Sequence, residues 1–535
     1  MMKKFLGILI ALMLVLSIAG CGTPEKASDE TTAAQTTQAA QETGKTPELP
    51  SSLVSTEPIK VKYLVQEHPS WPFNKDWAVW NNFTEATNVE FEFMPASGDA
   101  FTQKLRMLYA TNDLPDMIDY NLATANEFGV AGQLAKVNEY LDSMPNYKRI
   151  LDENPEGYDM LTAGDGNMYF MPCYGLPKYT KVWLYRSDVF EKHGLTPPTN
   201  TDELYNVLKE LKKLYPDSTP LINRSAMNSA IGNWLVDLSY QWGTGQMVYF
   251  NTTTNKWQFG PIEDNFKAML QYLNKLSSEK LLDPEWSTLA TKQWEDKMYA
   301  DDKAFVSFDY IYRIETMLPA AIQKNPNWKI KALEPINQQG IGEKKYSIRS
   351  RLSQTDGLMI SANSKYQKEL FKFADYLYSE EGALLSNFGK VGETAVKNAD
   401  GTYNWSNNIK TAMNPSGTDE YNTRYGFLTL GSYLRATEDS NKILYLSNAD
   451  VQAAFDLFDK NNYAAPLQPI LKFTEEESKQ VAELESAIRD FSLAEQVKFV
   501  QNGGFDKWDA YVDKIKGMKV DQLIEIYNTM QARQK

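Results

Sequence analysis

Apolar and polar residues alternate with a period of two over 59–63 and again over 89–93, which predicts two half-buried strands. Apolar residues then recur at helical spacing over 75–86 and over 99–110, and the segment Met117–Tyr120 predicts a third strand. The resulting order of strand, helix, strand, helix, strand is typical of a mostly parallel sheet with helices packed on it.

The same order starts again further along the chain. The run 182–185 predicts a strand, with Asp188 placed to cap the next helix and Gly194 placed to end it. A further helix opens at Thr201 or Asp202, and 220–222 predicts the strand after it. We expect a hairpin over 248–260, with its tip at 251–255, and two helices over 475–496 and 507–515.

The N-terminus is typical of an export signal. A basic start, Met1–Lys4, precedes fourteen uncharged residues, Phe5–Ile18, and the segment ends in Ala19-Gly20-Cys21. This ending resembles the bacterial lipobox, in which a peptidase cuts before Cys and the thiol receives diacylglycerol. An ordinary secretory signal with a chance Cys is the alternative. Residues 22–57 lack large apolar side chains almost throughout, which predicts a disordered tether on the outer face of the cell membrane.

Charge and cysteine content narrow the class of protein. The chain carries 55 Lys and Arg against 69 Asp and Glu, a net charge of −14, and no Lys/Arg-rich run. Binding of nucleic acid is therefore not expected. Lipidation of Cys21 would leave Cys173 alone, so no intramolecular disulfide forms, and we expect Cys173 to be a buried small residue.

Several segments, in their order along the chain, resemble the extracellular solute-binding protein family 1, the sugar-binding lipoproteins of ABC importers. These segments are Leu114–Ile118 (LPDMI), Leu184–Asp188 (LYRSD) followed by Gly194-Leu195, Pro198-Thr199 and Asp202–Leu204, Lys303–Val306 (KAFV) followed by Asp309, Ile360–Ser364 (ISANS), Phe373–Leu377 (FADYL) and Ser379–Gly382 (SEEG). The likeness covers about 58–450, and the length is similar to that of the long Bacillus- and Paenibacillus-type lipoproteins.

The resemblance implies an α/β, two-lobed fold of the periplasmic-binding-protein-like type II, with the ligand held in a cleft between the lobes. By analogy, lobe one would comprise 58–177 and 335–428, and lobe two 178–334 and 429–535. The implied function is a monomeric receptor that captures an oligosaccharide and delivers it to ABC permease subunits. Some relatives carry a calcium loop where this chain reads Leu214–Pro220 (LYPDSTP), which has too few oxygen ligands. We expect neither a metal nor a cofactor.

Candidate ligand contacts are sought just after strands, because ligands of open α/β sheets lie beyond the carboxyl ends of strands. In lobe one this rule selects His68 and Trp71 after the first strand, and Asp116 and Tyr120 around a later one. Asp116 has an equally good alternative, in which it accepts hydrogen bonds from loop amides. Tyr174 is placed near the first crossing between lobes.

In lobe two, Trp242 lies between polar and glycine residues before the hairpin and is expected to offer a flat face to a sugar. Asp309, Tyr310 and Arg313 follow the strand at 305–308, where the resemblance places cleft residues. By contrast, Trp77 and Trp80 have helical spacing and are expected in the core. Arg349 and Arg351 are interpreted as a surface pair.

No motif of nucleophilic, zinc or phosphate chemistry is present in the sequence, so we expect no catalytic activity. A glycosidase needs only two carboxylates, which leaves a secreted carbohydrate-active hydrolase as the main alternative. A surface sensor or adhesin without transport is a second alternative that the sequence does not separate from a receptor.

Overall fold

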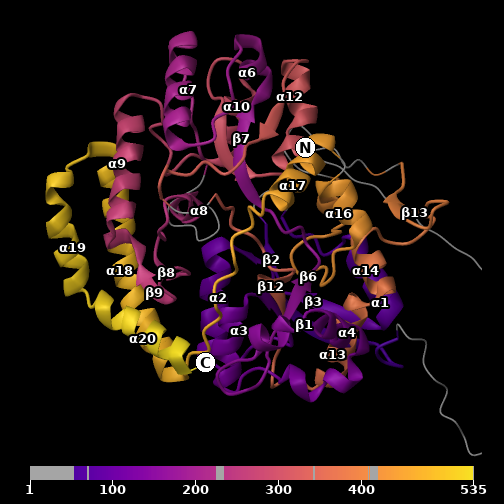
Figure 1. Ribbon diagram of the computed structural model, residues 1–535. Coiled ribbons are helices and arrows are strands. Elements are labelled where there is room, and N and C mark those ends of the chain that lie inside the picture. The colour runs from indigo at the N-terminus through magenta and orange to yellow at the C-terminus, as the bar shows by residue number, and fades with distance from the viewer. Residues whose placement is uncertain are drawn as a thin grey trace, which may run out of the picture. The chain divides into compact units, whose positions relative to one another are not determined.

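The computed structural model describes residues 53–68, 72–224, 234–341, 344–407, 409, 420–446 and 448–533. The predicted export signal, the predicted lipobox with Cys21, nearly all of the predicted tether and Trp71 lie outside these residues. The described part belongs to one compact unit, Leu49–Lys535 (Figure 1). None of its helices is long and apolar enough to cross a membrane.

The sheet of the first lobe has the strand order β3-β1-β5-β12-β6. β1 pairs in parallel with β3 and with β5, so the predicted order of strands and helices is confirmed. β12, which comes from much later in the chain, enters antiparallel between β5 and β6. The strands are β1 (Ile59–Leu64), β3 (Val89–Phe93), β5 (Met117–Tyr120), β6 (Met171–Tyr174) and β12 (Leu352–Ile360).

Helices enclose this sheet because each buries one apolar face. Trp80 and Phe83 of α1 lie in the core, and Trp77 just before it is buried too, as their spacing predicts. The remaining elements of this part are α1 (Ala78–Thr87), α2 (Gly98–Ala110), α3 (Leu122–Val130), α4 (Pro145–Glu153), α5 (Glu156–Leu161), α13 (Gln367–Tyr378), α14 (Glu380–Asn387), α15 (Glu420–Thr423), α16 (Glu438–Tyr445), the short pair β2 (Gln66–Glu67) and β4 (Ala96–Ser97), and the hairpin β13 (Ala395–Lys397) and β14 (Tyr403–Trp405).

The second lobe has a smaller, antiparallel sheet of order β10-β7-β11. The segment expected as a strand at 220–222 is represented only by bridges of Leu221 to Leu282 and Val306. The predicted hairpin is confirmed as β8 and β9. The strands are β7 (Lys181–Arg186), β8 (Val248–Asn251), β9 (Lys256–Phe259), β10 (Val306–Tyr310) and β11 (Ile330–Ala332).

Local sequence fixes the ends of the helices in this lobe. Gly194 ends α6 at φ 63°, as expected, whereas Asp188 binds the Arg186 guanidinium and does not cap the helix. Asn200, one residue before the predicted start, caps α7. The helices are α6 (Ser187–His193), α7 (Thr201–Leu214), α8 (Trp234–Gln241), α9 (Asp264–Ser278), α10 (Thr291–Tyr299), α11 (Arg313–Thr316), α12 (Leu318–Lys324), α17 (Ala449–Lys460), α18 (Glu475–Asn502), α19 (Trp508–Gly517) and α20 (Val520–Arg533).

Two separate hydrophobic cores define the lobes. The lobe-one core draws on 54–174 and 352–434, and the lobe-two core on 179–346 and 451–523. The predicted changes of lobe at 334/335 and 428/429 therefore come too early. Tyr346 belongs to the lobe-two core and Leu434 belongs to the lobe-one core. The chain therefore leaves lobe two after Tyr346 and leaves lobe one after Leu434.

Paired backbone segments connect the lobes. Tyr179 bridges Ile348 in antiparallel fashion, and the Arg349 N–H donates to the Lys178 carbonyl at 2.9 Å. Gly175 has φ 93°, and a Cβ there would lie 2.7 Å from the Ala436 carbonyl oxygen. Glycine is therefore required where the crossing segments meet.

Candidate functional site

The end of β10 carries a buried charged network on the lobe-two side. Asp309 is 3% exposed and accepts from Arg224, with Oδ2 2.5 Å from Nε and Oδ1 3.1 Å from Nη2. Arg313 at the start of α11 lies 3.4 Å from Asp309 Oδ1 and 3.2 Å from Glu295. Burial alone would raise the pKa of Asp309, but the charges of Arg224 and Arg313 outweigh burial and lower it.

Both oxygens of Asp309 are thus engaged by the protein itself. The backbone N–H of Tyr310 also donates to Oδ1, at 2.7 Å. Asp309 and Arg313 were expected to hold sugar hydroxyls, whereas here they brace Arg224 and the backbone at Tyr310. Arg224 was missed, although it stands just after the predicted strand at 220–222, where the rule used for the other candidates would have found it.

Tyrosine rings surround this ion pair. Tyr310 and Tyr312 stack with ring centroids 5.0 Å apart and planes at 25°, and Tyr312 lies 5.8 Å from Tyr445 at the end of α16. The Arg224 guanidinium lies 5.7 Å from the Tyr310 ring centroid, and Lys181 Nζ lies at the same distance on that ring. We call Tyr310, Tyr312 and Tyr445 the tyrosine group. Sequence reasoning found one of its three members.

A second ion pair stands beside the tyrosine group. Lys181 Nζ, at the start of β7, lies 3.6 Å from Asp237 Oδ2 of α8. Burial raises the pKa of Asp237, and the charge of Lys181 offsets part of that rise. Each of these cations therefore has a carboxylate within reach.

On the lobe-one side, Asp116 takes the structural role that was its alternative. Its Oδ2 accepts from the Lys62 backbone N–H at 2.8 Å, and its Oδ1 accepts from Ser364 at 2.6 Å. Tyr120 shares a 3.2 Å hydrogen bond with Thr102. Between them, Asp119 is 4% exposed, and burial followed by the charge of Asp356 raises its pKa well above the usual range.

The crossing segments bring further side chains to the same region. Tyr174 ends β6, and the Arg351 guanidinium lies 5.0 Å from its ring centroid. Arg349 is half-buried and its charge acts on Tyr310 of lobe two and on Tyr433 of lobe one. Arg349 therefore lies half-buried at the crossing between the lobes, whereas Arg351 is exposed, as expected of a surface residue. Cys173 is buried, as expected, and donates to the Tyr433 carbonyl at 3.3 Å.

His68 follows β2 on the lobe-one side. Burial, and secondly the charge of Arg224, lowers the pKa of His68 to about 4, so its ring is neutral at pH 7. Trp71, three residues on, lies outside the described residues.

Trp242 is placed differently from the expectation. It stands in a turn after α8, as its neighbours predict, but it is 3% exposed and belongs to the lobe-two core beside Tyr272. A side chain so deeply buried presents no face to a ligand. The neighbouring Gly243 correctly indicated a turn, but a turn in the backbone does not determine whether the Trp242 side chain is buried.

The loop at 214–220, which departs from the calcium loops of some relatives, is held by protein groups. Lys212 Nζ donates to the Ser218 carbonyl at 2.6 Å, and Thr219 donates to Asp283. Among the residues that the structure describes, no group of three or more His, Cys, Asp and Glu side chains is arranged to hold a metal ion.

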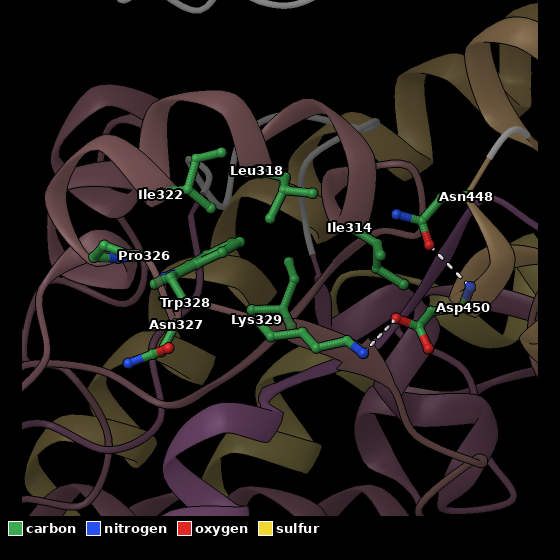
Figure 2. Close-up of a pocket in the computed structure, with 10 residues that line it drawn as sticks. Ile314, Leu318, Ile322, Pro326, Asn327, Trp328, Lys329, Asn448 and Asp450 are labelled. Atoms are coloured by element: carbon green, nitrogen blue, oxygen red, sulfur yellow. Dashed lines mark hydrogen bonds and ion pairs between the residues drawn. The ribbon is translucent and has the colours of Figure 1, made fainter.

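An apolar pocket of about 250 Å³ lies elsewhere on lobe two, beneath α12 (Figure 2). Lys329 and Asp450 form a 3.1 Å ion pair at its edge, and Asn448 caps α17 beside it. It contains no residue of the tyrosine group. Its lining residues are Ile314, Leu318, Ile322, Pro326, Asn327, Trp328, Lys329, Ile330, Asn448 and Asp450.

The chain is similar to several known proteins along most of its length. FusA of Streptococcus pneumoniae, described as a fructooligosaccharide ABC transporter substrate-binding protein, is 22% identical over 508 residues, which cover 87% of this chain and 89% of FusA. The structure of alginate-binding protein AlgQ2 superposes with a TM-score of 0.76 at 21% identity, over 90% of this chain and 99% of AlgQ2. An HMO-binding solute-binding protein of Bifidobacterium longum infantis superposes at 0.70 and 19% identity, over 89% and 99%.

These neighbours show that the fold is the two-lobed type II arrangement of solute-binding proteins. A family model described as bacterial extracellular solute-binding protein matches residues 72–384, which is more than half of the chain. The chain therefore belongs to the bacterial extracellular solute-binding protein family.

Proposed function

We propose that this protein is a lipid-anchored receptor on the outer face of the cell membrane, which captures an oligosaccharide between its lobes and delivers it to an ABC permease. The observation that carries the proposal is the tyrosine group beside the Arg224–Asp309 pair. Aromatic faces suit the CH-rich faces of sugar rings, and a braced guanidinium offers N–H donors in a fixed direction to hydroxyls.

The relatives support a carbohydrate ligand. FusA is named for fructooligosaccharides and has a structure with kestose, AlgQ2 is named for alginate, and the Bifidobacterium protein for HMO. The lipobox at Cys21 supports anchoring, and the tether supports display of the folded lobes away from the membrane. A monomer suffices for this role.

A thermal-shift panel of neutral and acidic oligosaccharides, kestose included, with short peptides as controls, tests the ligand class. A ligand at 100 times its Kd adds about 2.7 kcal/mol of stability. The proposal fails if peptides stabilise the protein and no oligosaccharide does.

The site is tested by calorimetric titration with a sugar that scores in the panel. Tyr312→Ala should weaken binding about tenfold, because a stacked aromatic face contributes roughly 0.5–1.5 kcal/mol beyond the area that it buries. Tyr312→Phe keeps the ring and should bind nearly as well as the natural protein. Tyr403→Ala, in the β13–β14 hairpin, is the matched control. Equal affinity of Tyr312→Ala and the control would refute the assignment.

We propose no turnover. A glycosidase needs a protonated carboxyl that the substrate can reach. Asp119 is the lobe-one carboxyl with the strongly raised pKa, but its side chain is buried and packs beside Gly431, so a substrate does not reach it. A bound oligosaccharide should be recovered intact by chromatography after long incubation. Reproducible cleavage that disappears on mutation of one carboxylate would favour the hydrolase alternative.

A further inference from the structure

The chain between α17 and α18 touches both lobes. After the crossing, the Ala465 N–H donates to the Tyr346 carbonyl at 2.9 Å within lobe two. Residues 466–474, which we call the strap, then run without regular secondary structure to the start of α18. The strap is therefore an additional stretch of chain beside the crossing segments.

On lobe one, the strap makes three kinds of contact. Ile470 packs against the lobe-one core, and Lys472 Nζ lies 2.5 Å from Asp159 Oδ1 of α5. Backbone meets backbone at Gly164, where a Cβ would lie 2.8 Å from the Phe473 carbonyl oxygen and 3.4 Å from that of Lys472. Glycine at 164 is what allows the strap to seat this closely.

The same strap is fixed to lobe two. Phe473 packs against the lobe-two core, with its ring centroid 5.1 Å from that of Tyr527 in α20. The Gln468 amide donates to the Tyr240 hydroxyl, and its carbonyl oxygen accepts from the Phe250 N–H at 3.3 Å. Adjacent strap residues thus hold opposite lobes.

α18 extends this link. The helix has 28 residues, a length of about 42 Å at the usual rise. It contacts α3 of lobe one and lies along α9 of lobe two, where Asn274 donates to the Val500 carbonyl at 3.0 Å (Figure 1). A rigid helix that touches both lobes transmits a movement of one lobe to the contacts on the other.

Side chains of the two lobes meet at the tyrosine group. Tyr312 of lobe two contacts Tyr445 of α16, and the neighbouring Ile443 and Leu444 pack on the lobe-one core. The strap is seated on lobe one at the same time. The seated strap and this contact between the lobes therefore occur together in one conformation.

We propose that the strap is a positioning device which holds the lobes close without touching the ligand, so that Gly164, Ile470 and Lys472 set ligand affinity from outside the cleft. The proposal rests on the proposed capture between lobes. A seated strap lowers the population of widely opened protein, and the fraction of protein that is competent to bind scales the apparent affinity.

The test measures the interlobe distance in ligand-free protein by pulsed electron paramagnetic resonance. Spin labels at Met107→Cys on α2 and Ile322→Cys on α12 use exposed positions, one on each lobe, in the Cys21→Ala chain. Cys173 is buried and should remain unlabelled. Gly164→Ala should lengthen and broaden the distance distribution, because its methyl group lifts the strap from lobe one.

Two further variants keep the test decisive. Lys472→Gln removes the ion pair without adding bulk and should shift the distribution in the same direction by a smaller amount. Gly517→Ala in α19, where a Cβ meets nothing within 4 Å, is the matched control. The urea midpoints of Gly164→Ala and Lys472→Gln should stay near that of Gly517→Ala. A general loss of folding stability would lower them instead.

With an oligosaccharide that binds, Gly164→Ala should weaken affinity about tenfold, mainly through faster dissociation. An unchanged distance distribution in both Gly164→Ala and Lys472→Gln overturns the proposal. A protein that binds no oligosaccharide would refute the proposed function, but it would leave the distances of the ligand-free protein as a separate result on the strap.

Discussion

Replacing Asp309 with Asn tests how strongly the charged network at the end of β10 stabilises the fold. The change keeps the shape of the side chain and removes the charge that two arginines share. Arg224 would lose its bidentate partner, and Arg313 would keep Glu295 alone. Asp309 is 3% exposed, so little water is available to replace the lost interaction.

The expected cost follows from this burial. Removing one partner of a buried ion pair costs about 3–5 kcal/mol, because the other charge stays buried and uncompensated. The Arg224 side chain is 19% exposed, which allows some screening, so we expect about 3 kcal/mol. Asp309 also has a lowered pKa. Its contribution should therefore be complete above about pH 4 and disappear as the pH falls through the lower, folded-state pKa.

Urea unfolding at pH 7 measures this cost, with Glu153→Gln as the matched control. Glu153 pairs with Arg149 on the surface of α4 at 3.3 Å, and such exposed pairs contribute about 0.2–1 kcal/mol. Adding Arg224→Met to Asp309→Asn should recover much of the loss, since no unpaired guanidinium remains at that position. A loss below about 1 kcal/mol for Asp309→Asn, equal to the control, would refute the reasoning.

Two further outcomes follow from the described side chains, and a third follows from the sequence around Cys21. The pKa of His68 is about 4 in the folded protein and 6.5 in the unfolded chain, so the unfolded chain binds more protons between these values and stability should fall as the pH drops from 6.5 to 4. His68→Gln should flatten this part of the plot of urea midpoint against pH, and an unchanged slope would contradict the lowered pKa. In the same assay, Trp242→Ala should destabilise the protein by about 3–5 kcal/mol, whereas Trp242→Phe should destabilise it by under about 1.5 kcal/mol, because the Trp242 Nε1 makes no hydrogen bond among the described residues. A small loss of stability in Trp242→Ala would make Trp242 a ligand candidate again. Cys21→Ala should release the protein into the medium, as shown by blotting of membrane and medium fractions, and unchanged membrane retention would rule out the lipobox.

Local pattern predicted the elements well where one face is buried. The alternation over 59–63 and 89–93 sets which side chains enter the core, and β1 and β3 pair in register from Ile59 with Val89. A slip by one residue would turn every apolar side chain outward, so the pattern itself specifies the pairing. Helix ends marked by glycine, such as Gly194, were equally readable from sequence.

Long-range pairing was not readable in this way. Arg224 and Asp309 are 85 positions apart, and nothing near either residue in sequence identifies its partner. The direction of the lobe-two strands likewise depends on how distant segments meet: β7 pairs antiparallel with both β10 and β11. The rule that selects residues after strands found Asp309 and Tyr310, because strand ends are local features, but it could not say that the carboxylate of Asp309 was already engaged.

The ion pairs around the proposed site lead to a final prediction about salt. Arg224, Arg313 and Lys181 each have a carboxylate within 4 Å, so they offer a ligand N–H donors with little net charge. Affinity for a neutral oligosaccharide should then depend on ring stacking and hydrogen-bond direction, which salt barely screens. Raising the salt from 0.1 M to 1 M shortens the screening length from about 10 Å to 3 Å. Calorimetric titration across this range should give a Kd that changes less than about twofold. A tenfold loss would mean that a charge without a carboxylate partner among the described residues, such as that of half-buried Arg349, carries the binding.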